Sequence, residues 1–243
     1  MAIEPITSIN TNISAQRATR VLVDSTVRLQ TSIARASSGL RITSPEVDAA
    51  GLAQFIQLDA QLSRLSAVDS NLANAVSFSE TQSGYLQQAQ SALDRMGELS
   101  ILAQDPTKSP SDLAALQQEF GQLQSSVSDI GTKQFNGVDL FPAAGAAVTT
   151  DSEGATMTLG TVDFAASGGS GGLADVFGGI AISTPSSAAA ALGTIVEATQ
   201  NLGNLRATVG ANLQSLGVTR ESNAALSENL SVAGIRIVDA DIA

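Results

Sequence analysis

The sequence SSGLRIT, residues 37–43, separates two stretches of helical periodicity and decides how the chain folds. The residues of the preceding stripe follow a 4-3-4-3-4 spacing, which is typical of a coiled coil: they are Leu22, Thr26, Leu29, Ile33, Ala36 and Leu40. Gly39 is suited to a helix end, and Ser44-Pro45 has the form of an N-cap followed by a first helical residue. The break therefore predicts a jointed rod whose first helix leaves the bundle formed by the others.

The stretch after this break, residues 45–104, predicts one long helix. A strict seven-residue register runs through it, with Ser79 in the one vacant place. Its members are Leu58, Leu65, Leu72, Leu86 and Leu93. Asp105-Pro106 ends the pattern, because proline cannot continue a helix. We expect this stripe to form a seam between helices.

Two further helices are predicted at 111–131 and 188–239. The first follows a capping-box sequence at 109–112 and carries apolar residues at 3-4-3-4-3 spacing, namely Leu113, Leu116, Phe120, Leu123, Val127 and Ile130. The second has another seven-residue register, formed by Ile195, Leu202, Val209, Leu216, Leu230 and Ile237. Asn223 fills its remaining position, where it either fixes the register or faces solvent.

Between these helices lies a region of different composition. Asn136-Gly137, within FNGVDLF (135–141), predicts a tight β-hairpin. Residues 142–185 are rich in Gly, Ala, Ser and Thr, with SGGSGG at 167–172, and predict a flexible insertion or a small surface domain. The predicted fold is mainly α: a long antiparallel helical rod or coiled-coil bundle with a β-hairpin and a small Gly/Ser-rich outer insertion.

Composition excludes several classes of function. The 243 residues include no Cys and no His, so thiol chemistry, His acid–base catalysis and His or Cys metal sites are excluded. The net charge of −11 argues against nucleic-acid binding. No apolar run reaches the roughly 18 residues of a membrane span, and the N-terminus lacks the pattern of a Sec signal peptide. We therefore predict no enzyme activity, no cofactor, no metal and no membrane insertion.

Five segments, in order, resemble bacterial flagellin. They are INTNISAQRATR (9–20), SSGLRITSPEVDAAGLA (37–53), LDRMGELSILAQ (93–104), FNGVDLF (135–141) and LSVAGIRIVDADIA (230–243). The resemblance implies a secreted, self-assembling subunit of the extracellular flagellar filament, which serves motility. It implies three kinds of partner: other copies of the chain, the flagellar export machinery and an export chaperone. Export would then proceed without a Sec signal.

The resemblance also implies a division into domains. Residues 1–42 would belong to the innermost domain, 43–141 and 186–243 to the rod domain, and 142–185 to a variable outer part. The chain ends at Ala243, where the family's C-terminal innermost helix begins, so the first helix would lack that partner. We expect residues before about 37 to be disordered, protease-sensitive or paired with another molecule. Gly97 stands where the family often has Arg, and a helical glycine costs about 1 kcal/mol relative to Ala.

Three residues, Arg95, Leu99 and Glu119, match positions at which some flagellins contact an innate-immune Toll-like receptor. The alternative is structural: Leu99 would be a core residue, and the two charged residues would lie on a solvated face or a subunit contact. The hook–filament junction protein shares the expected architecture, although the INTN start favours the filament subunit. A cytoplasmic coiled-coil module of the chemotaxis-receptor type is the alternative from another class, and the hairpin and Gly/Ser-rich insertion argue against it.

Overall fold

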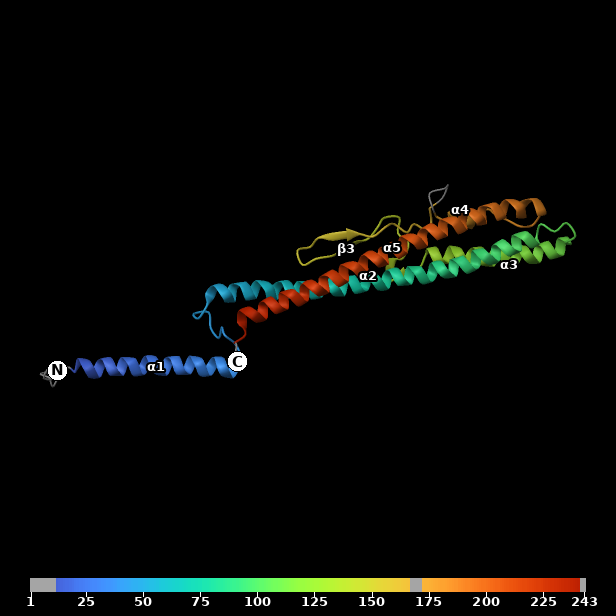
Figure 1. Ribbon diagram of the computed structural model, residues 1–243. Helices are drawn as coiled ribbons and strands as arrows, with labels where there is room; N and C mark the ends of the chain where they lie inside the picture. Colours follow the sequence, from blue (N-terminus) through green and yellow to red (C-terminus); the bar gives the residue numbers. More distant parts are fainter. Residues whose placement is uncertain (1–11, 167–171, 241–243) are drawn as a thin grey trace. The chain divides into compact units, whose positions relative to one another are not determined.

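The computed structural model describes residues 12–166 and 172–240, and it confirms a mainly α fold (Figure 1). The helices are α1 (Ile13–Ser38), α2 (Ala49–Leu102), α3 (Pro110–Gly131), α4 (Ala174–Phe177) and α5 (Pro185–Val238). The strands are β1 (Gln134–Phe135), β2 (Val138–Asp139), β3 (Ala147–Thr149) and β4 (Thr156–Thr158). The start of the INTN segment, most of SGGSGG and the last three residues of the chain lie outside the described residues.

The chain divides into two compact units. The terminal unit comprises Met1–Ser63 and Leu226–Ala243, and the central unit comprises Arg64–Ala225. The α2 and α5 helices each contribute residues to both units, because each is 54 residues long, or about 80 Å. The domain boundaries expected at 42, 141 and 185 describe how far each segment lies from the centre of an assembly of many copies. They therefore stay predictions.

The α1 helix is closed at both ends by local contacts. Asn12 Oδ1 accepts a hydrogen bond from Ala15 N at 3.0 Å, which satisfies a free amide of the first turn. Gly39 adopts the left-handed conformation, with φ 70°, and donates from its N–H to Arg35 O. No side chain of α1 is buried. Local capping and its own backbone hydrogen bonds therefore hold this helix, without a packed face.

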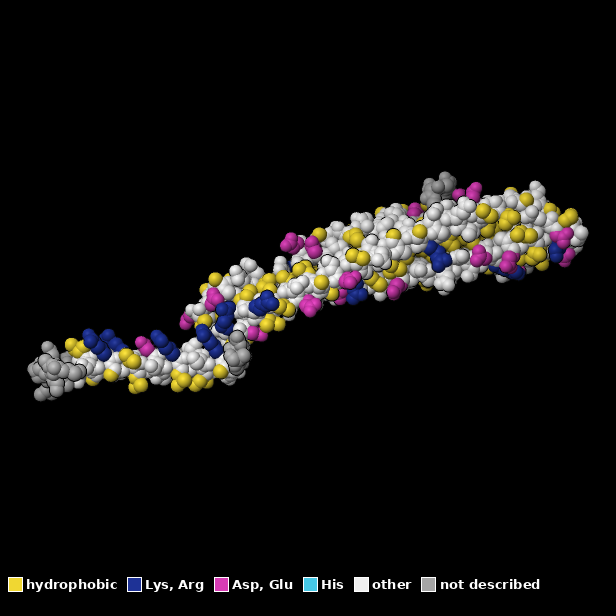
Figure 2. Space-filling view, in the orientation of Figure 1, with side chains coloured by type: hydrophobic (Ala, Val, Ile, Leu, Met, Phe, Trp, Pro, Cys, Tyr) yellow, Lys and Arg dark blue, Asp and Glu magenta, His cyan; other side chains and the backbone are white. Residues whose placement is uncertain are grey.

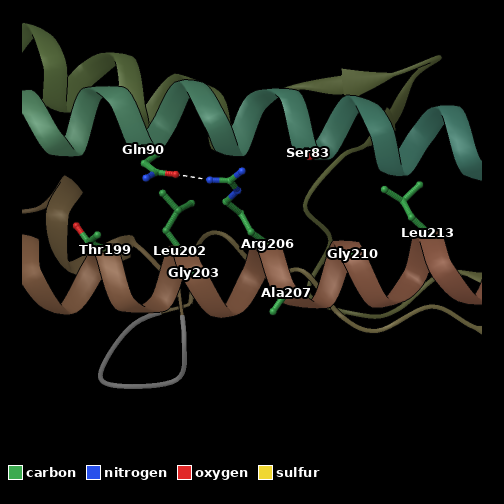
Figure 3. Close-up of a pocket in the computed structure, with 9 residues that line it drawn as sticks. All are labelled: Ser83, Gln90, Thr199, Leu202, Gly203, Arg206, Ala207, Gly210 and Leu213. Atoms are coloured by element: carbon green, nitrogen blue, oxygen red, sulfur yellow. Dashed lines mark hydrogen bonds between the residues drawn. The ribbon is translucent and has the colours of Figure 1, made fainter.

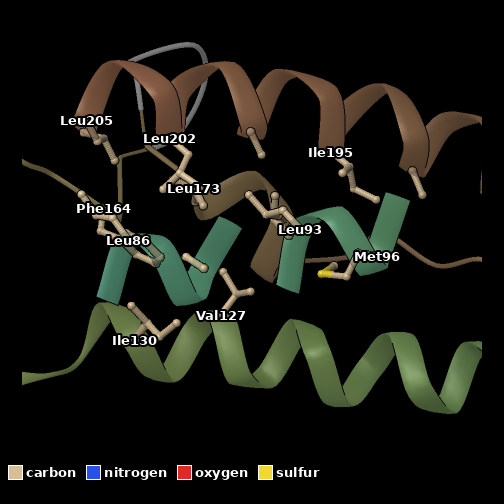
Figure 4. Packing of buried hydrophobic residues seen from close by; sticks show 14 of the residues in the cluster. Leu86, Leu93, Met96, Val127, Ile130, Phe164, Leu173, Ile195, Leu202 and Leu205 are labelled. Atoms are coloured by element: carbon tan, nitrogen blue, oxygen red, sulfur yellow. The ribbon is translucent and has the colours of Figure 1, made fainter. Parts of the chain in front are cut away.

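The core of the central unit lies between α2, α3 and α5 (Figure 4). Most residues of the predicted seams are buried: Leu65, Leu72, Leu86, Leu93, Phe120, Val127, Ile130, Ile195, Leu202, Val209 and Leu216. Six are only partly buried: Leu58, Leu113, Leu116, Leu123, Leu230 and Ile237. Asn223 is 8% exposed and donates to Thr150 O at 2.8 Å, so its amide does not face solvent. Ser79, in the vacant place of the α2 register, is fully buried.

The cap of α3 and the β1–β2 turn form where local sequence motifs predict them. Ser109 and Asp112 form the predicted capping box of α3, and hydrogen bonds from the Ser109 hydroxyl and amide lower the pKa of Asp112. Asn136 and Gly137 both have positive φ, 50° and 79°, and link β1 to β2 as predicted. The hairpin is held on α2 by Phe135, whose ring meets Phe78 edge-on at 5.9 Å.

The described residues of 142–185 share the core of the central unit. Their contribution consists of Val162, Phe164, Leu173, Val176 and Ile182. The antiparallel pair β3–β4 packs on a second cluster formed by Val68, Leu72, Leu159 and Leu216. The Gly/Ser-rich composition therefore does not keep these residues away from the helices.

Side chains of the helices bind the main chain of this connection directly. Asn212 receives a hydrogen bond from Gly160 N at 2.8 Å and donates to Gly160 O at 3.1 Å. Equivalent contacts join Gln82 to Leu140 O, Asn223 to Thr150 O, Arg64 to Ser152 O, Asn201 to Gly172 O, Gln124 to Val176 O and Gln117 to Ile182 N. We call this set of contacts the amide clamps.

Candidate functional site

The chain after α1 pairs with the end of α5 inside the terminal unit. Arg41 N donates to Val238 O at 2.7 Å, and Ala240 N donates to Gly39 O at 2.9 Å. Leu40 and Asp239 thus form an antiparallel bridge. We call residues 39–51, with their partners at 237–240, the joint.

The side chain of Arg41 completes the joint. Its Nε and Nη2 donate to Ile237 O at 3.1 and 2.6 Å, in the last turn of α5, where the exposed carbonyls favour a cation. Its Nη2 also lies 3.9 Å from Asp48 Oδ2. One guanidinium therefore links the end of one helix to the beginning of another.

Asp48 caps α2, which runs from Ala49 to Leu102, and this corrects the predicted helix at 45–104. Asp48 Oδ1 accepts from Gly51 N at 2.8 Å, as an N-cap residue does. Residues 44–47 form a turn instead, with Val47 N donating to Ser44 O. Asp48 thus supplies a side-chain cap in addition to a negative charge at the helix N-terminus.

Gly51, which belongs to none of the predicted stripes, caps or turns, leaves room for this cap. A Cβ at Gly51 would lie 2.5 Å from Asp48 Oδ2 and 3.0 Å from Ile42 Cδ1. Ile42 is itself buried, so it has little space in which to move. A glycine three residues after a capping aspartate is the only sequence signal that could have identified the position.

Gly51→Ala is expected to loosen the joint by roughly 1–3 kcal/mol, because it displaces Asp48 and overpacks Ile42. Gly97→Ala is the matched control: its Cβ would meet only Ile195 Cγ2, at 3.8 Å, and nothing in the structure explains the native glycine. We expect the control to stabilise the chain by about 0.5–1 kcal/mol. Hydrogen exchange of the α2 amides measures both effects, and equal protection of residues 49–55 in the two variants would contradict the assignment.

The stripe of α1 is largely exposed. Leu22, Leu29 and Ile33 are 68%, 60% and 59% exposed. Figure 2 shows hydrophobic side chains along one side of α1 and Lys and Arg along the other. A narrow apolar stripe at coiled-coil spacing fits the seam of another helix. This stripe and the joint form the candidate functional site.

The three residues predicted to contact a receptor do not share one environment. Arg95 Nε lies 2.8 Å from Glu119 Oε1 and Arg95 Nη1 lies 2.8 Å from Glu98 Oε2, on an exposed face of α2 and α3. These hydrogen bonds, the one to Glu119 first, raise the pKa of Arg95 above its ordinary value. Leu99 is fully buried in the core. The structure brings Arg95 and Glu119 together on the surface and buries Leu99 in the core.

A groove of about 460 Å³ runs between α2 and α5 in the central unit (Figure 3). Arg206 lies in it and donates to Gln90. Its lining includes no carboxylate or nucleophile–base pair that would support catalysis. Within residues 12–166 and 172–240, no three side chains of metal-binding type come together, and no helix has the length and apolarity to cross a bilayer.

Comparison with known proteins gives a consistent result. The family described as bacterial flagellin N-terminal helical region matches residues 9–146. The flagellar filament 30.7 kDa core protein of Treponema maltophilum is 32% identical over 248 residues, covering 97% of this chain and 87% of the relative. The crystal structure of Bacillus cereus flagellin has a TM-score of 0.55 and 24% identity, covering 63% of this chain and 88% of its own.

A second solved structure resembles the fold. It is a Vibrio parahaemolyticus protein described as hook-associated, with a TM-score of 0.67 and 13% identity, covering 79% of this chain and 99% of its own. At that identity the likeness shows the fold alone. Relatives that match nearly the whole chain, such as the filament core proteins of Treponema maltophilum and Treponema phagedenis, favour the filament over the hook.

Proposed function

The chain belongs to the bacterial flagellin family and is a structural, non-enzymatic subunit of the flagellar filament, and on that premise we propose which part of the filament each segment of the chain forms. In this proposal the stripe of α1 joins copies of the chain into the filament core. The three helices of the central unit form the rod around that core. The observation that carries the proposal is that Leu22, Leu29 and Ile33 are each more than half exposed on a helix with no buried residue.

An exposed stripe of this kind is unfavourable in an isolated subunit. Apolar surface costs about 25 cal/mol per Å² when it stays in water, and most of the stability of helices in proteins comes from the packing of an amphipathic face, which α1 lacks. Covering the stripe with helices of other copies recovers this free energy. Contacts that repeat from copy to copy without closing give a helical filament. Within the terminal unit, Arg41 of the joint links the segment after α1 to the end of α5 and, through Asp48, to the start of α2.

Limited proteolysis tests this proposal. In the monomer we expect the first cleavages before Ser37, followed by a stable fragment that begins near Ile42, because α1 has no packed face. In the filament the same bonds should resist the protease. Resistance of residues 13–36 in a proven monomer would show that α1 is already covered, and would contradict the proposed role.

We propose that the subunit reaches the cell surface through the flagellar export machinery, with a chaperone covering the stripe until assembly. An amphipathic helix without tertiary contacts is easily unfolded for passage through a narrow channel. The domain boundaries at 42, 141 and 185 follow the same scheme, with 1–42 innermost and 142–185 outermost. Co-purification of the export chaperone with wild-type chain, and its loss after Leu22→Asp and Leu29→Asp, would support this step.

A second candidate function is recognition by a Toll-like receptor. The favouring observation is that Arg95 and Glu119 are about half exposed and fixed against each other. Leu99 would act indirectly, by packing beneath them. If the pair makes the contact, Arg95→Ala with Glu119→Ala should lower receptor signalling at least tenfold, by about 1.4 kcal/mol or more. Glu80→Ala, on an exposed position elsewhere on α2, is the control, and equal signalling by all three proteins would refute the contact.

A further inference from the structure

The side of α1 away from the stripe carries a row of arginines. At about 100° of rotation per residue, Arg17, Arg20, Arg28 and Arg35 fall within about 80° of one another, roughly opposite Leu22, Leu29 and Ile33. Asp24 is the one acidic residue of the helix. Figure 2 shows the basic side chains along this side. We call these four residues the arginine face.

The arginine face has no carboxylate partner within the described part of the chain. The ion pairs there involve Arg41, Arg95 and Arg220, and none involves an arginine of α1. With four arginines and one aspartate, α1 has a net charge of +3, in a chain whose net charge is −11. The helix therefore has two unpartnered faces, one apolar and one cationic.

The acidic surplus lies in the central unit. Its six basic and fifteen acidic residues give it a net charge of −9. Packing many copies of α1 into one assembly brings like charges together, which costs free energy unless carboxylates approach them. Complementary charge between copies also fixes the register of an interface.

We propose that the arginine face docks against carboxylates of a second copy of this chain, so that α1 binds its neighbours by two different faces. The inference rests on the proposed role of α1 in assembly and adds a specific electrostatic contact to it. The stripe supplies the association energy, and the arginine face selects which neighbour and which register α1 adopts.

A basic amphipathic helix can also bind an anionic membrane. The stripe of α1 argues for a protein partner, since it is narrow, keeps coiled-coil spacing and includes Ala and Thr. Membrane-surface helices usually present a wider apolar face with aromatic residues. No aromatic residue occurs in residues 13–38.

The test compares two sets of substitutions in the full chain. One set replaces all four arginines with glutamine (R17Q, R20Q, R28Q and R35Q), and the other replaces them with lysine and keeps the charge. Lys108→Gln with Lys133→Gln controls for a change in net charge outside α1. The measurement is the critical concentration for filament growth at about 50 and 300 mM NaCl, where screening differs strongly.

We expect the glutamine set to raise the critical concentration roughly tenfold at low salt, with a smaller difference at high salt. The lysine set and the control pair should behave like the wild-type chain. Carbodiimide coupling of the lysine set in filaments mixed from ¹⁵N-labelled and unlabelled copies should join α1 lysines to carboxylates of a different copy.

Equal critical concentrations and equal salt dependence in all variants would overturn the inference and leave the proposed function intact. Coupling only within one copy would overturn it as well. So would binding of the chain to vesicles with about 30% anionic lipid that the glutamine set loses while its filaments grow normally. Failure of the wild-type chain to grow at any salt concentration would overturn the proposed function, and the inference with it.

Discussion

Phe120→Asp is expected to lower the free energy of unfolding by roughly 3 kcal/mol or more, the largest effect of any single substitution considered for stability. Phe120 is fully buried in the core between α2, α3 and α5. An aspartate at this position loses the packing of the ring and brings a carboxylate into apolar surroundings that offer it no cation. Leu116→Asp should cost less, because Leu116 is only partly buried.

Urea denaturation followed by circular dichroism measures this change. Gln122→Asp is the matched control, since Gln122 lies two residues away on an exposed position of α3. We expect the control to change the free energy of unfolding by less than about 0.5 kcal/mol. The same unfolding midpoint for Phe120→Asp and Gln122→Asp would show that the core is assigned to the wrong face of α3.

Leu22→Asp combined with Leu29→Asp is expected to abolish filament growth, the largest effect on function. Both side chains are exposed, so the stability of the subunit should change little. In the filament, two carboxylates would lie in an apolar seam, at a cost of several kcal/mol for each unpaired charge. Growth on filament seeds, followed by light scattering and electron microscopy, measures the loss.

The control for this variant introduces the same two aspartates on another face of α1. Val23 and Val27 are 55% and 56% exposed on the same helix, but they lie outside the stripe. Val23→Asp with Val27→Asp should therefore impair growth far less than the Leu22 and Leu29 variant, although the two aspartates lie near the arginine face. Filaments of normal yield from the Leu22 and Leu29 variant would remove the stripe from the assembly interface.

The helices could be predicted because their burial repeats along the chain. Heptad spacing gave 111–131 and 188–239, and the structure has Pro110–Gly131 and Pro185–Val238. A regular stripe encodes both the element and its buried face, so residues such as Leu86 and Leu202 could be placed from the spacing alone. The hairpin at Asn136-Gly137 was equally readable, since its turn needs residues that tolerate positive φ.

The joint and the connection at 142–185 could not be predicted in the same way. Ser44-Pro45 has the sequence pattern of a helix start. The helix nevertheless starts after Asp48, because the Asp48 carboxylate accepts a hydrogen bond from Gly51 N and caps the helix there. Contacts such as that of Asn212 with Gly160 join residues far apart in the sequence and involve the main chain. They therefore produce no periodic pattern in the sequence. The sequence marks Asn223 only as a polar residue in an apolar heptad register. Its hydrogen-bond partner, Thr150, belongs to no such register.

The amide clamps bear on how this protein can diverge. Most of them hold the connection by its carbonyl and amide groups, which every residue type supplies apart from the missing N–H of proline. Exposed side chains between the clamped positions can therefore change without loss of attachment, provided that the few apolar anchors such as Phe164 and Ile182 remain. Selection can thus alter the exposed side chains of this stretch, while Asn212, Gln124 and the helices that carry them stay constant. Variation between related chains should accordingly concentrate in exposed residues such as Glu153 and Ala155.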